Sequence, residues 1–413
     1  MVRLLNSRIV IVSAARTPVG GFDGILAPYD AVELGAHAIR AAVQRAGVSP
    51  GKIDTVSMGL VVSCGYGEAP AKEAALRAGL RETVHARAVE SVCGSAMDAI
   101  CITAEMVLCG ASSIAVAGGM ESRSNAPYLL GPRFWKAAGG YQPGMRLKVK
   151  RAGAYRFALS EHIEQQLSAV EIRDPTAYDG LFWPRERKFM REYALAFAKK
   201  MDYTVEQVNA LAADSHRKAW QATESGAFAD EIVPVGDASS DELMTPEEQQ
   251  RVIAEKPDDI ASAFNTSVPS DAGAAVVLAT AENARELGLP VMASILGYSR
   301  LDGAAADFLS RPVDAVAELR SALEQSGDKK PFEIIEANEA FGVQLPLFFE
   351  AFSPMKINVH GGAVALGHPF GAAGARILTT LLHAMKRYGH RRGIATLCFG
   401  SGGAYAIAVE RAG

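Results

Sequence analysis

The sequence has no long apolar segment, few cysteines and no excess of positive charge. Residues 9–12 form an apolar run far shorter than the roughly 18–20 residues of a membrane span, and no other uninterrupted run approaches that length. Five cysteines among 413 residues make no disulfide framework and favour a reducing compartment. A formal net charge of −4 argues against nucleic acid as the main partner. These absences predict a soluble, cytoplasmic protein with no signal peptide and no membrane span.

What is present indicates a large globular chain. It is 49% hydrophobic and 21% charged, and its length predicts more than one hydrophobic core. The N-terminal third alternates short β-branched runs with alanine-rich amphipathic stretches. Strands are expected at residues 9–12, 55–62 and 114–117, and helices at residues 31–46 and 94–108. This alternation favours an α/β fold in which helices cover a largely parallel sheet.

The last third repeats this scheme. Helices are expected at residues 313–325, 341–352 and 371–386, and strands at residues 332–335, 394–397 and 404–409. In each half a cysteine lies where a strand gives way to a turn, which suggests a duplicated unit.

The middle of the chain is richer in charge, aromatic residues and proline. It contains two basic tracts, whose members are Arg133, Lys136, Arg146, Lys148, Lys150, Arg151 and Arg156, and Arg185, Arg187, Lys188 and Arg191. Solvated surface explains them, and so does contact with a phosphate-bearing ligand. We expect an inserted loop domain at residues 124–259. The N-terminal half then comprises residues 1–123 and about 260–283, and the C-terminal half residues 284–413.

Three segments carry the residues expected to do chemistry. Cys93, in residues 91–96 (SVCGSA), precedes a helix whose N-terminus lowers a thiol pKa. His368, in residues 358–369 (NVHGGAVALGHP), lies between glycine-rich turns, where an imidazole can accept a thiol proton. Cys398 begins the stretch CFGSGG after an apolar run. Taken singly, each could be a buried cysteine or a core histidine; together they suggest acyl-thioester chemistry.

Two further groups complete this candidate site. Gly400 can offer its backbone N–H to a developing oxyanion. Asn338, within residues 336–341 (EANEAF), can position a water or a carbonyl oxygen, although helix capping also explains Asn338 and Glu339. His360 is interpreted as a structural turn residue. No Cys/His or carboxylate cluster has the spacing of a metal site, so we expect no metal.

These segments resemble the thiolase family along nearly the whole chain. Residues 11–18 (IVSAARTP) are similar to the family's first strand and turn, and residues 118–128 (GGMESRSNAPY) to its strand-to-loop segment. The resemblance is most specific at residues 358–376. It implies a five-layered α/β/α/β/α fold, built from two similar halves with a loop domain inserted in the first.

The resemblance also implies roles for single residues. Cys93 would be the acylated nucleophile, His368 its activating base and Cys398 the acid and base for the second substrate. One oxyanion hole would combine His368 with a water held by Asn338, and the other the backbone N–H groups of Cys93 and Gly400. Two residues of this sequence match positions near the substrate: Ser267 near the pantetheine arm and Met190 in the acyl pocket. The co-substrate would be coenzyme A, with no metal or prosthetic group, in a homodimer or homotetramer.

The sequence departs from the family pattern at a few positions. Glu90 stands where asparagine is common, and Ala96 where glycine is common. Phe189 and Arg191 flank Met190, where short-chain thiolases often carry histidine and glycine. These departures keep a second hypothesis open, a thiolase-like acyl-CoA or lipid carrier or scaffold with little turnover. A ketoacyl synthase is a third hypothesis, and Cys398 with its glycines argues against it.

Overall fold

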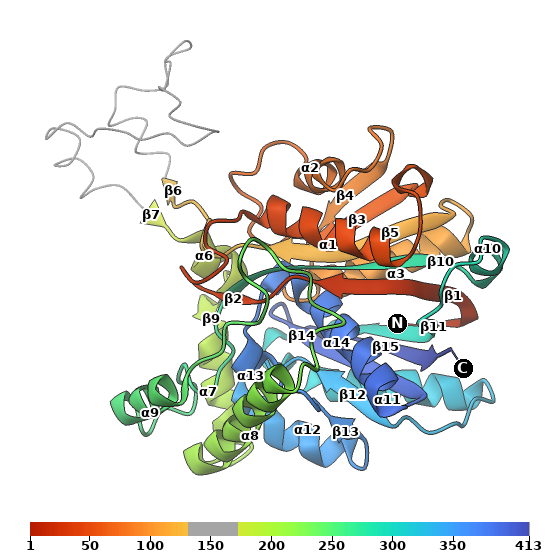
Figure 1. Ribbon diagram of the computed structural model, residues 1–413. Coiled ribbons are helices and arrows are strands. Elements are labelled where there is room, and N and C mark those ends of the chain that lie inside the picture. Colours follow the sequence, from red (N-terminus) through yellow and green to blue (C-terminus); the bar gives the residue numbers. More distant parts are fainter. Residues whose placement is uncertain (131–171, 413) are drawn as a thin grey trace, which may run out of the picture.

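The computed structural model describes residues 1–130 and 172–412 (Figure 1). The basic tract at residues 133–156 lies outside these residues. Within the described part, no helix is both long and apolar enough to cross a membrane.

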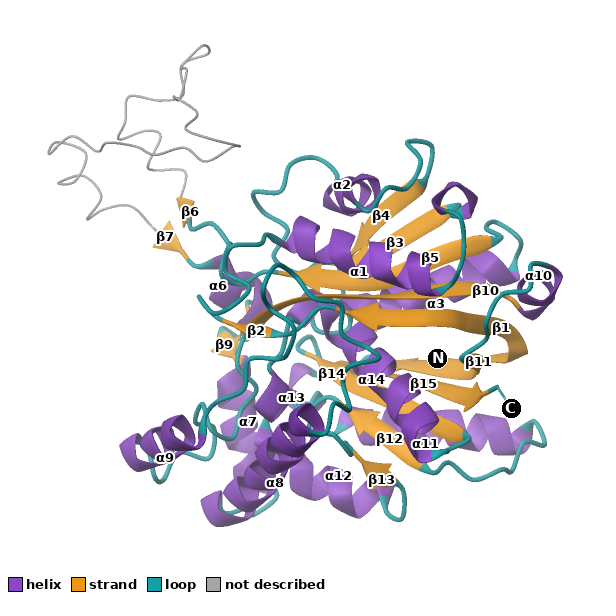
Figure 2. Cartoon of the chain, viewed as in Figure 1, coloured by secondary structure: helices purple, strands orange, loops and turns teal. Residues whose placement is uncertain are grey.

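The strands form two similar sets that join edge to edge (Figure 2). The N-terminal set has the order β4-β3-β5-β10-β1, with β1 (Val2–Arg16), β3 (Thr55–Gly59), β4 (His85–Val89), β5 (Ile114–Glu121) and β10 (Ser270–Thr280). The C-terminal set has the order β13-β12-β14-β15-β11, with β11 (Ala293–Leu301), β12 (Ile334–Ala337), β13 (Lys356–Ile357), β14 (Arg392–Phe399) and β15 (Gly403–Arg411). β1 pairs with β11, which joins the sets into one sheet, and β2 (Gly20–Gly21) pairs with β10.

The helices and the two strand sets alternate in five layers. The outer helices are α1 (Ala31–Arg45) and α2 (Pro70–Arg77) on the N-terminal set, and α11 (Arg311–Gln325) and α12 (Leu345–Phe352) on the C-terminal set. The central layer contains α3 (Ser95–Leu108) and α14 (Ala373–Tyr388), whose apolar side chains share one core with strands of both sets. The five-layered α/β/α/β/α fold expected from the resemblance is therefore confirmed.

The two central helices approach closely where each begins. A Cβ built on Gly374 would lie 2.5 Å from the backbone nitrogen of Met97, so α14 needs a residue without a side chain there. Helix α3 begins directly after Cys93, and α14 begins shortly after His368. The packing of these helices therefore brings two predicted catalytic residues toward each other from different halves.

The remaining elements lie mostly in the middle of the chain. Within its described residues, the helices are α6 (Pro175–Leu181), α7 (Met190–Lys200), α8 (Val205–Glu224) and α9 (Pro246–Glu255), and the short strands are β6 (Leu129–Leu130), β7 (Ile172–Arg173), β8 (Phe182–Trp183) and β9 (Lys188–Phe189). Elsewhere lie α10 (Ala281–Glu286), α13 (Ala363–Leu366) and four single 3₁₀ turns. Helix α7 packs beside Phe308, Phe341 and Cys398, and α8 contacts α12 and α13. The domain boundaries given above stay a prediction.

Most predicted elements are present with small shifts. The helix expected at residues 31–46 is α1 (Ala31–Arg45), which begins after an Asp30–Glu33 capping box and is followed by Gly47 at φ +65°. The expectation of a largely parallel sheet is wrong, because only β3 with β4 and β5, and β12 with β13 and β14, pair in parallel. The central pairs are antiparallel. For β14 and β15 the cause is local, because the turn that links them is too short for a parallel crossover.

The strand orders of the two sets match, as a duplicated unit predicts, but the cysteines do not occupy equivalent places. Cys93 lies between β4 and α3. The equivalent connection of the second half, between β13 and α14, contains His368. Cys398 lies within β14, whose counterpart is β5. The presence of a cysteine in each half is therefore not valid evidence for a duplicated unit, although the matching strand orders support the duplication.

Candidate active site

Cys93 sits on a strained turn that joins β4 to α3. Val92, a β-branched residue, has φ +49°, which is a costly conformation. Ser95 Oγ holds the turn, because it donates to the Val92 carbonyl at 2.6 Å and accepts from the Ser91 N–H at 2.9 Å. Glu90 accepts the Val92 N–H at 2.8 Å. The surroundings thus fix the backbone on either side of the thiol.

The electrostatics of Cys93 differ from the sequence prediction. Burial raises the pKa of the Cys93 thiol well above its usual range, and the nearby Cys398 and Glu121 raise it further. The backbone N–H groups of Cys93 and Gly400 lower the pKa, but burial outweighs them. The expected low pKa is therefore wrong for the unliganded protein. A thiol in this state needs a base beside it to become a nucleophile.

The buried Glu339 carboxylate holds the loop that carries His368. It accepts from Ser215 Oγ at 2.7 Å, from Asn358 Nδ2 at 2.8 Å and from the Val364 N–H at 3.1 Å. Glu339 is therefore a buried anchor of residues 358–364 and caps the first turn of α13 through the Val364 N–H, whereas the expected capping of the helix that follows it in sequence is wrong for it. At the end of the loop, the His368 N–H donates to the Val268 carbonyl at 2.9 Å.

Residue 362 must be glycine, because it lies against the Glu339 carboxylate. A Cβ on Gly362 would lie 2.3 Å from the Glu339 carboxyl carbon. Because three hydrogen bonds hold that carboxylate, Gly362→Ala is expected to destabilise the protein by about 1–3 kcal/mol through overpacking. Urea unfolding measures this. Gly51→Ala is the matched control, since its Cβ would meet only Ser49 Oγ at 3.9 Å; equal stability of both variants would contradict the prediction.

The His368 ring is buried and uncharged. Burial lowers the pKa of His368 to about 3, and the guanidinium groups of Arg376 and Arg123 lower it too. Neither ring nitrogen has a hydrogen-bond partner among the described residues. In the uncharged ring, one nitrogen is therefore available to accept a proton and the other to donate a hydrogen bond.

Cys398 and Asn338 lie on neighbouring strands of the second half. Burial raises the pKa of Cys398 to about 12, and Gln344 opposes this by directing Nε2 at the sulfur from 3.6 Å. Asn338 follows β12, and its N–H donates to the Thr396 carbonyl at 2.9 Å. Its buried side-chain amide has no partner in the described part of the chain. An unpaired buried amide is suited to hold a water or a substrate oxygen.

One cavity of about 510 Å³ brings most of the predicted residues together. Six of the seven line it: Cys93, Met190, Ser267, His368, Cys398 and Gly400. Asn338 is the exception. The remaining wall is largely aromatic, with Phe189, Phe308, Phe341 and Phe370. A Cβ on Gly400 would lie 2.8 Å from Met190 Sδ, so glycine keeps the space beside Cys93 open.

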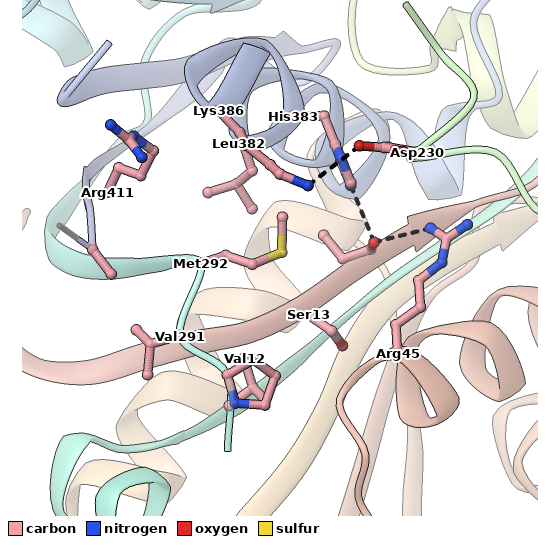
Figure 3. Close-up of a pocket in the computed structure, with 13 residues that line it drawn as sticks. Val12, Ser13, Arg45, Asp230, Val291, Met292, Leu382, His383, Lys386 and Arg411 are labelled. Atoms are coloured by element: carbon pink, nitrogen blue, oxygen red, sulfur yellow. Dashed lines mark hydrogen bonds and ion pairs between the residues drawn. The ribbon is translucent and has the colours of Figure 1, made fainter. Parts of the chain in front are cut away.

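A second cavity, of about 480 Å³, lies elsewhere, between β1, the end of α14 and Arg45 (Figure 3). His383 Nε2 lies 3.3 Å from the Ala14 carbonyl oxygen, and Lys386 pairs with Asp230 at 3.3 Å. No cysteine lines it. The described residues also contain no group of three or more His, Cys, Asp and Glu side chains placed to hold a metal, and the expectation of no metal stays a prediction.

Comparison with known proteins decides the family. The thiolase N-terminal domain matches residues 9–282, and the thiolase C-terminal domain matches residues 289–411. The chain belongs to the thiolase family. Acetyl-CoA acetyltransferase of Escherichia coli is 37% identical over 97% of this chain and 98% of its own, and that of Pseudomonas aeruginosa is 36% identical over 98% and 99%. The solved structure of Acat5 thiolase from Ascaris suum in complex with coenzyme A has a TM-score of 0.81, at 33% identity over 98% of this chain and all of that one.

The departures from the thiolase pattern can now be placed. Ala96 is fully buried in the central core and does not line the cavity, so its methyl group does not crowd an acyl group on Cys93. Phe189 is 45% exposed and lines the cavity next to Arg191, which pairs with Asp259 at 2.6 Å. With phenylalanine at position 189, the cavity rim is more apolar than it would be with a histidine there.

Sequence reasoning missed two residues beside this site. Gln344 lies beyond the EANEAF segment and contacts Cys398 only through the tertiary fold. Arg123 lies inside the GGMESRSNAPY segment, where the one cation, set between two serines, was the available signal.

Proposed function

We propose that this thiolase is an acyl-CoA C-acyltransferase. It cleaves a 3-ketoacyl-CoA with coenzyme A to acetyl-CoA and a shortened acyl-CoA, or runs the reverse Claisen condensation, through an acyl-Cys93 intermediate. The observation that carries the proposal is the presence of two thiols and an unpaired imidazole on one cavity wall. The acetyltransferase relatives and a coenzyme A-bound thiolase of the same fold support it.

In the degradative direction, His368 takes the Cys93 proton, and the thiolate attacks the ketone carbon of the substrate. The new oxyanion is stabilised by the backbone N–H groups of Cys93 and Gly400, the same groups that lower the Cys93 pKa. The carbon–carbon bond then breaks, and the electron pair on the leaving acetyl-CoA carbon takes the proton of Cys398. His368 and a water held by Asn338 support the enolate oxygen.

The second half-reaction restores both thiols. The Cys398 thiolate removes the thiol proton of coenzyme A, and the resulting thiolate attacks the acyl group on Cys93. The Cys93 thiolate leaves and recovers its proton from His368. Burial keeps Cys398 protonated in the resting protein, as a group that must first act as an acid requires.

The ligand-binding residues belong to the same proposal. Ser267 Oγ donates to the Ala340 carbonyl at 2.7 Å on the cavity wall, a place suited to meet the pantetheine arm. Met190, 5% exposed, borders the acyl side. An adjoining cavity of about 410 Å³ shares Gly180, Leu181, Met190 and Gly400, which supplies space beyond Cys93 for an acyl chain.

Assembly and location remain part of the proposal. Homodimers or homotetramers are expected from the family resemblance, and light scattering after gel filtration measures the number of subunits. The proposed location is the cytoplasm, and the proposed chemistry needs no metal or prosthetic group.

Intact-mass spectrometry tests the function directly. The protein is mixed with acetyl-CoA, acetoacetyl-CoA and longer 3-ketoacyl-CoAs. One acyl adduct is expected on Cys93, and it should disappear when coenzyme A is added; the adduct yields rank the substrates. A folded protein that binds coenzyme A but forms no adduct would refute the proposal and favour the carrier or scaffold hypothesis.

A further inference from the structure

Arg123 is a buried cation two residues beyond β5, and it forms no ion pair with the other described residues. It is 6% exposed, and its backbone N–H donates to Asp271 Oδ1 at 2.6 Å, which fixes the chain there. Its Nε and Nη1 atoms are buried and have no hydrogen-bond partner among the described residues. By contrast, the buried Arg16 is bound by two carboxylates. A buried guanidinium that forms no ion pair is costly, which suggests a role other than stability.

The guanidinium of Arg123 adjoins the catalytic histidine through one aromatic ring. Its Cζ lies 4.9 Å from the centre of the Phe370 ring. The centre of the same ring lies 5.0 Å from that of His368, and the two rings meet edge to face at 72°. Phe370 also lines the Cys93 cavity, whereas Arg123 does not. The cation therefore acts on the site through space and does not touch a ligand.

The charges around Arg123 leave it positive near neutral pH. Burial lowers the pKa of Arg123 to about 10, while Glu121, Asp174, Asp271 and Cys93 oppose that shift. These four groups lie on four different segments of the chain. Glu121 itself is held by the N–H groups of Val61, Val62 and Gly371, so it is not free to pair with the guanidinium.

We propose that Arg123 is an electrostatic positioning residue of the nucleophile: its fixed positive charge behind Phe370 favours the thiolate of Cys93. A positive charge favours the deprotonated form of each neighbouring group. Arg376 acts on His368 in the same sense, whereas Cys398 and Glu121 oppose ionisation of Cys93. Arg123 thereby offsets part of the cost of burying the nucleophile.

This inference rests on the proposed role of Cys93 as nucleophile, but its test needs no turnover. Iodoacetamide alkylates the thiolate of cysteine, so the rate of Cys93 alkylation against pH reports ionisation at the site. In Arg123→Met and Arg123→Gln, Cys93 alkylation at about pH 7–9, where Arg123 is charged in the unchanged protein, is expected to be about tenfold slower, because a nearby positive charge is lost. Peptide mapping separates Cys93 from the exposed Cys109, whose profile should not change.

Arg191→Met is the matched control, because it removes an exposed cation at the mouth of the same cavity. Its Cys93 profile should match that of the unchanged protein. Two neutral variants are used so that one misfolded protein, identified by circular dichroism, does not decide the result. An unchanged rate of Cys93 alkylation near neutral pH in a folded Arg123 variant would overturn the inference. The absence of acyl adducts with acyl-CoAs, beside a shifted alkylation profile, would count against the proposed function alone.

Discussion

Cys93→Ala and Cys398→Ala are expected to fail at different steps. Without Cys93 no acyl-enzyme forms, and turnover should fall by at least about 10⁴-fold, on the scale seen when a covalent nucleophile is removed. Without Cys398, acetyl-CoA should still acetylate Cys93, since His368 receives the thiol proton and coenzyme A can leave as its thiolate, although it lacks the proton that Cys398 supplies. Formation or cleavage of the carbon–carbon bond should slow by about 10²–10⁴-fold, the usual contribution of a general acid or base.

Two measurements on each variant separate these steps. Intact mass reports acetylation, and absorbance of the acetoacetyl-CoA enolate reports turnover. Cys101→Ala is the matched control, because this buried thiol lies within α3 and does not line the cavity. Normal turnover in Cys398→Ala would exclude it as the acid and base. Loss of acetylation in that variant would show that Cys398 also acts in the first half-reaction.

Arg16→Met is expected to have the largest effect on stability. Arg16 is fully buried and binds Glu231 through Nε at 2.7 Å and Asp241 through Nη1 at 2.6 Å and Nη2 at 2.9 Å. Thr380 Oγ1 donates to the same Glu231 oxygen at 3.0 Å, which ties α14 to the network. Removing the cation leaves two buried carboxylates uncompensated, and breaking a buried ion pair in this way costs about 3–5 kcal/mol.

The free energy of unfolding in urea measures that loss. Arg77→Met is the control, because its ion pair with Glu73 is an exposed pair one helical turn apart and is worth less than about 1 kcal/mol. A loss in Arg16→Met no greater than in this control would contradict the prediction.

Local sequence predicted which residues gather at the candidate site better than it predicted their electrostatics. Cys93, His368 and Cys398 each stand in a short glycine-containing segment, and all three line the cavity. How deeply the fold buries Cys93 cannot be predicted from the residues next to it in the sequence. The expected effect of the helix N-terminus on the Cys93 pKa was therefore outweighed by desolvation.

Tertiary pairing explains the other differences. Helix and strand positions follow from local periodicity, but whether strands run parallel depends on which of them become neighbours, as with β10 between β1 and β5. The same limit applies to Gln344 and Arg123. Their partners, Cys398 and Phe370, lie 54 and 247 residues away along the chain and become neighbours only in the folded protein.

The close contact of α3 and α14 at Gly374 has a consequence for how such an enzyme can diversify. The distance between Cys93, the proposed nucleophile, and His368, its proposed base, depends on how closely α3 and α14 pack in the centre of the molecule. The walls that meet the acyl chain come instead from α7, the segment around Gly180 and the phenylalanine side chains at the cavity rim. Substitutions at the rim can change which acyl group fits while the bond-forming geometry stays constant. Chemistry and substrate range are thus encoded in separate parts of the fold, and selection can alter one without disturbing the other.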